Sequence, residues 1–171
     1  SRRIIRQRVS NLLYAGERSA AGELLLDYVA RAWTFLRDVS ATRSDLALLE
    51  GYVEGQHRAR HKRWRAEAER HAGNLGDARK LAEEARRLFA EQEDRENEAQ
   101  CLRLLAHIAS DQGAPALGRI EAVLARTMFD TLENDVGKAQ CDLVLGEIDY
   151  LLGDHTTARA ELAAAAGQFR R

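Results

Sequence analysis

Small and apolar residues recur along the chain at spacings of three and four, the pattern of one face of an α-helix. In one such helix this face carries Leu102, Leu105, Ala106 and Ala109. Further along, a second helix is expected to supply larger apolar groups to the packing: Ile120, Leu124 and Phe129. The composition also disfavours β-sheet, so an all-α chain is predicted.

The helical pattern repeats with a period of 40 residues. Glycines stand at positions 73, 113 and 153, and the stretches that follow them share further residues at equal offsets. These shared positions are Ala85, Ala125 and Ala165, then Phe89, Phe129 and Phe169, and in the preceding helices Cys101 and Cys141. A fixed period of this length is typical of a solenoid of stacked helical units.

Each unit is expected to be a helix, a glycine turn and a second helix. Glycine tolerates the left-handed conformation in which helices commonly end. Asp154, or Asn74 in the earlier copy, follows the glycine and is expected to cap the next helix. The small residues at 85, 125 and 165 let neighbouring helices approach closely. A single hairpin cannot bury its apolar face, so the units are expected to stack.

The N-terminal part is less regular. Gly16 precedes a long helix over Arg18–Arg37, which we interpret as the second helix of a further unit. A break is expected at Ser40–Asp45, with Ser44 capping a new helix that continues to about Ala72 and is interrupted at Gly51 and Gly55. The sequence therefore predicts an irregular N-terminal region over 1–58, three repeats over 59–171, and about eight helices.

Composition and charge narrow the class of protein. One proline, 6% aromatic residues and abundant Ala, Leu, Glu and Arg favour helix. No apolar run approaches the about 18 residues of a membrane span, so no membrane segment is predicted. Residues 1–70 hold 14 Lys/Arg against 9 Asp/Glu, and the remaining residues 12 against 18, although the net charge is only −1. We expect a fragment of a longer, cytoplasmic and bacterial protein.

The 40-residue unit resembles the tetratricopeptide repeat. Gly146 is followed seven residues later by Gly153-Asp154, and Ala158 stands five residues after that glycine. This spacing is similar to the long, roughly 40-residue variety of bacterial signalling ATPases and transcription regulators. The resemblance implies a right-handed solenoid of helical hairpins and a concave groove that holds a peptide.

By the same resemblance, the groove is lined from the first helix of each unit. Its expected residues are Arg60, Arg63, Glu67 and Arg70, then Gln100, Arg103 and His107, then Gln140 and Glu147. Arg63 and Arg103 are equivalent, and two guanidinium groups suit an acidic peptide; alternatively each pairs with a neighbouring acid. In the helix that carries Arg63, positions expected to be apolar hold Lys62, Arg65 and Glu69, so Trp64 is interpreted as its core anchor or as a groove contact.

The segment QHRARHKRWRAEAERH, residues 56–71, concentrates positive charge, with five Lys/Arg between His57 and Arg65. The segment could be a solvated helix face or a site for an acidic partner or phosphate. A contact with nucleic acid is the least favoured interpretation. Within it, Glu54-x-x-His57 and His61 have a metal-like spacing. Because no second such motif exists in the sequence, neither a metal site nor a cofactor is predicted.

No arrangement of nucleophile and base is found in the sequence. Cys101 and Cys141 occupy equivalent repeat positions, one repeat apart, which is too far for a disulfide and indicates core residues. The glycines are isolated turn residues and form no phosphate-binding loop. The sequence therefore predicts a protein without enzymatic activity.

We interpret the chain as a scaffold for a protein or peptide, the interaction or sensor region of a larger regulatory protein. One alternative is a domain of a transcription regulator that senses a ligand or signalling peptide, and another is a nucleic-acid adaptor acting through residues 57–65. Exposed ends of the stack are also expected to allow self-association.

Overall fold

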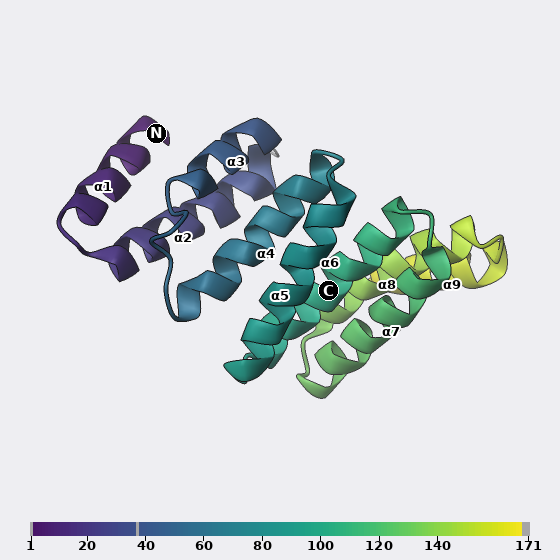
Figure 1. Cartoon of the computed structure of the whole chain (residues 1–171). Coiled ribbons are helices and arrows are strands. Elements are labelled where there is room, and N and C mark those ends of the chain that lie inside the picture. The colour runs from purple at the N-terminus through teal and green to yellow at the C-terminus, as the bar shows by residue number, and fades with distance from the viewer. Residues whose placement is uncertain (1, 37, 169–171) are drawn as a thin grey trace. The chain divides into compact units, whose positions relative to one another are not determined.

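The computed structural model describes residues 2–36 and 38–168, which form nine α-helices and no strand (Figure 1). Their bounds are α1 Arg2–Tyr14, α2 Arg18–Leu36, α3 Val39–Ala47, α4 Gln56–His71, α5 Leu75–Glu91, α6 Arg95–Asp111, α7 Pro115–Thr131, α8 Asp135–Leu151 and α9 His155–Gln168. The all-α prediction is confirmed, with one helix more than the expected eight. Arg37 and Phe169, which were part of the sequence patterns, lie outside the described residues. No described helix combines the length and the hydropathy needed to cross a bilayer.

The chain divides into two compact units, Ser1–Leu88 and Phe89–Arg171. The buried core of the first unit consists of Val9, Ala21, Leu25, Leu26, Val29, Trp33, Leu46, Leu49 and Trp64. Trp64 is therefore a core anchor. The predicted change of repeat type at residue 58 lies inside the first unit and stays a prediction.

The second unit has two apolar clusters, which join its helices into stacked hairpins. One contains Ala99, Leu102, Ala125, Phe129 and Cys141, and the other Ala106, Ala122, Val144, Leu145 and Ile148. The face predicted from Leu102, Leu105, Ala106 and Ala109 is buried, as are Ala125 and Ala165. Close packing explains the small residues, because a Cβ added to Gly118 would lie 2.7 Å from the carbonyl oxygen of Ala106.

Helix starts from α5 to α9 recur every 20 residues, at 75, 95, 115, 135 and 155, so each hairpin spans 40 residues. The glycine turns predicted from the sequence are confirmed, with φ of 84° at Gly73, 77° at Gly113 and 85° at Gly153. The turns that lead from one hairpin to the next use the same left-handed geometry at Glu93 and Glu133, whose φ angles are 58° and 54°. No residue pattern predicts these two turns, because a glutamate disfavours that conformation.

Replacing Glu133 with glycine is expected to raise the free energy of unfolding by about 0.5–1 kcal/mol, because glycine adopts positive φ without the steric cost of a Cβ. The reciprocal control is Gly113→Glu, which places a side chain in the same geometry and should lower stability. Urea denaturation of the full chain measures both. A loss of stability in Glu133→Gly would contradict the account.

Short-range polar contacts begin several helices. The Asp154 side chain accepts a hydrogen bond from the Thr157 amide at 3.0 Å, which confirms the predicted cap of α9. Asp94 and Asn134 cap α6 and α8 in the same way. The Asn74 side-chain amide donates to Glu69 Oε2 at 2.6 Å, and the capping of α5 by Asn74 stays a prediction.

The first unit corrects two expectations. α2 begins and ends within a residue of the predicted helix, but the break expected at Ser40–Asp45 is wrong, because these residues lie inside α3. Asp38 caps that helix by accepting from the Ala41 amide at 2.8 Å, so the predicted cap Ser44 is an interior position. The glycines at 51 and 55 do separate α3 from α4.

α2 is a first helix of a hairpin rather than the second helix that the Gly16 turn indicated. It packs against both α3 and α4, and α3 also packs against α4. The same three pairings occur among α6, α7 and α8 in the second unit. α2 therefore takes the place of α6, and the short α3 that of α7.

An ion-pair ladder links α7 and α8. Arg119 Nε donates to Asp149 at 2.8 Å, and Arg126 Nε donates to Asp142 one heptad further along. Both aspartates are buried, and the bond to Asp142 raises the pKa of the Arg126 guanidinium. On α9, burial and the nearby Asp149 carboxylate raise the pKa of Glu161 to about 7.

Stability of the second unit is therefore expected to fall as pH rises. Glu161 keeps its proton up to about pH 7 in the folded chain but only to its ordinary pKa of 4.5 when unfolded. Its contribution is thus full below pH 4.5 and is lost as pH rises through 7. The shift corresponds to about 3 kcal/mol, which screening at this half-exposed site reduces to about 1–2 kcal/mol.

Glu161→Gln should remove this dependence and be more stable than the wild type at pH 8. Glu147→Gln, an exposed change on α8, is the control. Thermal unfolding at pH 5 and pH 8 compares the three proteins. An equal pH dependence in wild type and Glu161→Gln would contradict the assignment.

Candidate functional site

The first helices α2 and α4 lie side by side in the first unit, and α4 carries the predicted groove positions of that unit. The 40-residue period, applied backwards from Arg60, Arg63 and Glu67 on α4, leads to Ala20, Glu23 and Asp27 on α2. Sequence reasoning missed these residues, because Gly16 stands outside the glycine period and α2 was interpreted as a second helix.

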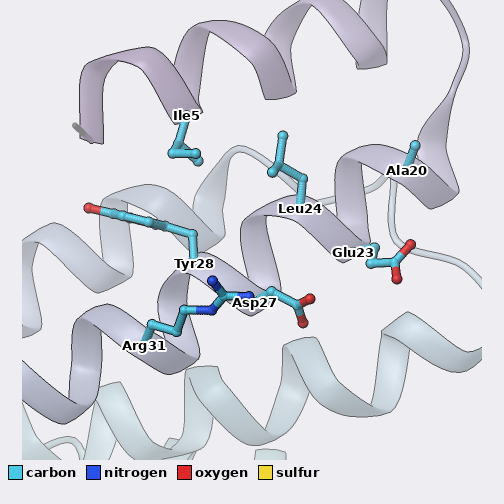
Figure 2. A pocket seen from close by; sticks show the side chains of 7 residues that line it. All are labelled: Ile5, Ala20, Glu23, Leu24, Asp27, Tyr28 and Arg31. Carbon is cyan, nitrogen blue, oxygen red and sulfur yellow. The ribbon is translucent and has the colours of Figure 1, made fainter.

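A pocket of about 370 Å³ opens at these α2 positions, against α1 (Figure 2). Its lining consists of Ile5 from α1 and, from α2, Ala20, Glu23, Leu24, Asp27, Tyr28 and Arg31. Ile5 and Leu24 point toward each other across it, while the three charged residues follow one side of α2 (Figure 2). An apolar interior with a few polar groups at its rim is the usual composition of a ligand site.

Asp27 joins the pocket to the predicted groove. Arg60 Nη2 on α4 donates to Asp27 Oδ1 at 2.5 Å. Glu23 and Arg31, at the two ends of the pocket, form no ion pair with another described residue and are exposed. They are therefore available to charged groups of a ligand.

The other groove positions of α4 are engaged within the unit. The Arg63 guanidinium lies 4.5 Å from the centre of the Trp64 ring. Glu67 Oε1 lies 3.6 Å from Arg70 Nη2 and 3.4 Å from His71 Nε2. Arg70 Nη2 also donates a hydrogen bond to His71 Nε2 at 2.7 Å. The structure thus brings Glu67 and Arg70 together near the end of the helix, as a cluster with His71.

In the second unit, the side chains of Gln100 and Arg103 are hydrogen-bonded to each other on α6. The Gln100 side-chain oxygen accepts two bonds from the Arg103 guanidinium, at 3.2 and 2.9 Å. His107 and Gln140 are half-buried, and Glu147 on α8 is exposed. Arg63 lies in the first unit and Arg103 in the second, so their joint contact with an acidic peptide stays a prediction.

The basic stretch is largely compensated by internal ion pairs. Besides the Arg60–Asp27 bond, Lys62 contacts Glu84 and Arg65 contacts Glu50, both at 2.5 Å. The Lys62 hydrogen bond lowers the pKa of the Glu84 carboxyl. These pairs also explain the charged residues at positions 62 and 65, which were expected to be apolar.

Weak binding to nucleic acid is therefore expected. With three of the five cations engaged by carboxylates, few charges remain to release counterions from phosphates. Fluorescence anisotropy with a labelled duplex at 50 and 200 mM salt checks this. Tight binding that weakens steeply with salt, and that is lost in Arg58→Gln, would contradict it.

The metal-like spacing of Glu54, His57 and His61 does not form a site. α4 begins at Gln56, so Glu54 lies outside the helix and pairs with Arg18 at 2.6 Å. Ser19 Oγ lies 3.1 Å from His57 Nε2, and the Leu46 carbonyl lies 3.0 Å from His61 Nε2. Burial lowers the pKa of His61. Across 2–36 and 38–168, no three metal-binding side chains cluster.

The two cysteines are buried, as the repeat pattern predicted. Burial raises the pKa of the Cys141 thiol to about 12, so it stays protonated at neutral pH. A protonated, buried thiol is a poor nucleophile and acts as a packing residue.

Solved structures of other proteins share this arrangement of helices. A putative kinesin light chain of Podosopora anserina with nearly identical TPR-like repeats superposes with a TM-score of 0.62, over 97% of this chain and 93% of that one, at 14% identity. Another structure of that protein gives 0.60 at 14% identity, again over 97% and 93%. BtubC (BKLC) of P. vanneervenii gives 0.54 at 15% identity, over 99% of this chain and 89% of that one.

The chain has a TPR-like helical-repeat fold. This confirms the resemblance to the tetratricopeptide repeat drawn from Gly146, Gly153 and Ala158. The closer resemblance to the 40-residue repeats of bacterial signalling ATPases and transcription regulators stays a prediction. No protein-family model and no curated sequence matches the chain. At these identities the structural likeness shows the fold alone.

Proposed function

We propose that the chain is a non-catalytic scaffold that binds a protein or peptide along its first helices. The observation that carries this proposal is the pocket on α2, which the Asp27–Arg60 bond joins to the predicted groove of α4. The TPR-like fold supports it, because stacked hairpins offer extended surfaces for a chain to follow.

The pocket suits one apolar side chain of such a partner. Ile5, Leu24 and Tyr28 supply the apolar contacts, while Glu23 and Arg31 are exposed at its ends. An apolar anchor with charged groups on either side is a common basis of peptide recognition. We also propose that the partner is acidic, because Arg63 and Arg103 occupy equivalent groove positions and suit carboxylates.

We place this scaffold in the bacterial cytoplasm, as the interaction or sensor region of a larger regulatory protein. Support comes from the Arg- and Ala-rich composition, from the two free cysteines and from the uneven charge of the sequence. Arg63 and Arg103, with the other predicted groove residues, are the proposed contacts.

Affinity capture with pocket variants tests the proposal. Ala20 is exposed and lines the pocket, so Ala20→Phe fills it without removing a core group. Ala163→Phe, at an exposed position of α9, is the matched control. A partner held by wild type and Ala163→Phe but lost by Ala20→Phe would support the proposal. A partner retained by all three would refute the pocket as the site.

A sensor of a small ligand or signalling peptide is a second candidate. The pocket volume of about 370 Å³ falls in the range of small-molecule sites, about 300–1,000 Å³. A screen of small molecules and short peptides for a rise in melting temperature tests this candidate. A rise in wild type that Ala20→Phe abolishes would favour it, and no rise with any compound would count against it.

A further inference from the structure

α7 exposes a row of large aliphatic side chains on the face opposite its core contacts. Ile120 is 60% exposed, Leu124 50%, Leu117 42% and Val123 40%. Ile120 and Leu124 were expected in the core, and that expectation is wrong, although Phe129 is fully buried as predicted. The helix buries its other side through Gly118, Ala122, Ala125 and Phe129.

The row is a continuous uncharged stripe along the helix. Leu117, Ile120, Leu124, Thr127 and Thr131 follow heptad spacing, i, i+3, i+7, i+10 and i+14. The two threonine hydroxyls donate back to helix carbonyls, Thr127 to Val123 at 2.9 Å and Thr131 to Met128 at 2.7 Å. Their hydroxyl protons are thus used within the helix, and their methyl groups extend the apolar stripe.

The equivalent positions of neighbouring repeats show that the fold does not require this stripe. On α5 they hold Asp77, Lys80, Glu83 and Glu84, and on α9 they hold Thr157, Ala160, Ala163 and Ala164. The charged α5 face has the composition expected of a solvent-exposed helix surface. Large aliphatic groups at this place are special to α7 and indicate a contact surface.

One edge of the stripe carries two arginines at the same heptad spacing, followed by Asp130, which is paired with Lys138 at 2.6 Å. The Arg119 and Arg126 side chains are 45% and 41% exposed, and each uses its Nε to bind an aspartate of α8. Their Nη groups form no hydrogen bond with another described residue, so these donors remain for an incoming carboxylate. On the opposite side of the stripe the charged residue of α7, Glu121, is buried, so that edge exposes no charge of this helix.

We propose that the exposed face of α7 docks an amphipathic α-helix of a partner protein, with an aliphatic stripe and carboxylates along one edge. The stripe takes the partner's apolar residues, and Arg119 and Arg126 take carboxylates one heptad apart. This surface is on a second helix of a hairpin, so it is separate from the pocket on α2 and does not depend on the function proposed there.

A second copy of this chain fits the surface less well. In an antiparallel pair of α7 helices each edge faces the same edge of the other copy, so the arginines would face arginines or Asp130, a carboxylate that Lys138 already binds. In a parallel pair the arginines would face the uncharged edge. Neither arrangement supplies an unpaired carboxylate, because Asp130 is already bonded to Lys138 at 2.6 Å, whereas a partner helix with an acidic edge does.

Two synthetic helical peptides of about three heptads test the proposal against the full chain. Both carry leucines at the stripe positions, and one edge is glutamate in the first peptide and lysine in the second. Fluorescence anisotropy is expected to show at least tenfold tighter binding of the glutamate peptide. Ile120→Lys should weaken that binding at least tenfold, and the exposed change Ala164→Lys, at the α9 position equivalent to Leu124, should leave it unchanged.

Three results would overturn the proposal. Equal binding of the two peptides would show that carboxylates along the partner's edge do not contribute to the affinity. Binding that survives Ile120→Lys would show that the peptide binds elsewhere on the chain. A concentration-dependent dimer, seen by analytical ultracentrifugation and lost in Ile120→Lys, would assign the surface to a second copy of the chain.

Discussion

Replacing Phe129 with alanine is expected to lower the free energy of unfolding by about 3–5 kcal/mol. Phe129 is fully buried and packs in the cluster that also holds Ala99, Leu102, Ala125 and Cys141. Alanine would lose the transfer energy of the ring and leave a cavity between the two hairpins of the second unit.

Gly137 on α8 lies directly against the Phe129 ring, so the two positions should be coupled. A Cβ added there would lie 2.4 Å from Phe129 Cδ1, so Gly137→Ala alone should cost about 2–3 kcal/mol through overpacking. In the Phe129→Ala background the same methyl group meets a cavity instead, and alanine also favours the helix by about 0.5–1 kcal/mol. In this background Gly137→Ala should leave the free energy of unfolding unchanged or raise it.

Urea denaturation of the wild type, the two single variants and the double variant measures the coupling between the two sites. Gly167→Ala is the control, because no atom lies within 4 Å of its added Cβ. Strictly additive losses would show that Phe129 and Gly137 do not share this contact.

Arg126→Met is expected to lower stability by about 2–3 kcal/mol. The substitution leaves the Asp142 carboxylate buried without its cation, and the exposure of Arg126 reduces the loss below the about 3–5 kcal/mol of a fully buried pair. The equivalent of Asp142 in the preceding repeat is Leu102, which packs in the apolar cluster. Arg126→Met with Asp142→Leu should therefore recover most of the loss.

The same denaturation experiment compares the wild type, Arg126→Met and the double variant. A double variant as unstable as Arg126→Met would mean that the site at Asp142 differs from the Leu102 site in more than its charge. Thr127→Ala, an exposed change on the same helix, controls for altered helix propensity.

Most of the repeat geometry could be predicted from residue spacing. Gly73, Gly113 and Gly153 mark turns that need a left-handed residue, and small residues such as Ala125 mark close helix contacts. These are local requirements, so each repeat shows them in sequence. Glu93 and Glu133 could not be predicted as turn residues, because the next helix and its cap impose positive φ on them despite the steric cost.

The errors arise where more than one environment fits a residue. Ile120 and Leu124 have helical spacing and apolar side chains, but the interior of the hairpin is filled by Phe129 and small residues, which leaves them outside. Ser44 has the side chain of a cap, yet Asp38 begins the helix six residues earlier. Pattern alone does not distinguish these choices.

The candidate site was only partly visible in the sequence. Arg60 could be placed on a groove by resemblance, but its partner Asp27 stands 33 residues earlier, on a helix that was assigned to another place in its hairpin. The pocket depends on contact between α1 and α2, which no repeat position predicts. The 40-residue offset from Arg63 to Glu23 is the signal that could have found it.

Hydrogen–deuterium exchange on the full chain, with and without a partner obtained by affinity capture, tests the central claim most directly. The account predicts protection on binding in α2, residues 18–36, and in α4, residues 56–71, with loss of that protection in Ala20→Phe. Protection confined to other helices, or protection of α2 and α4 that Ala20→Phe leaves intact, would contradict binding at the pocket and the adjoining first helices.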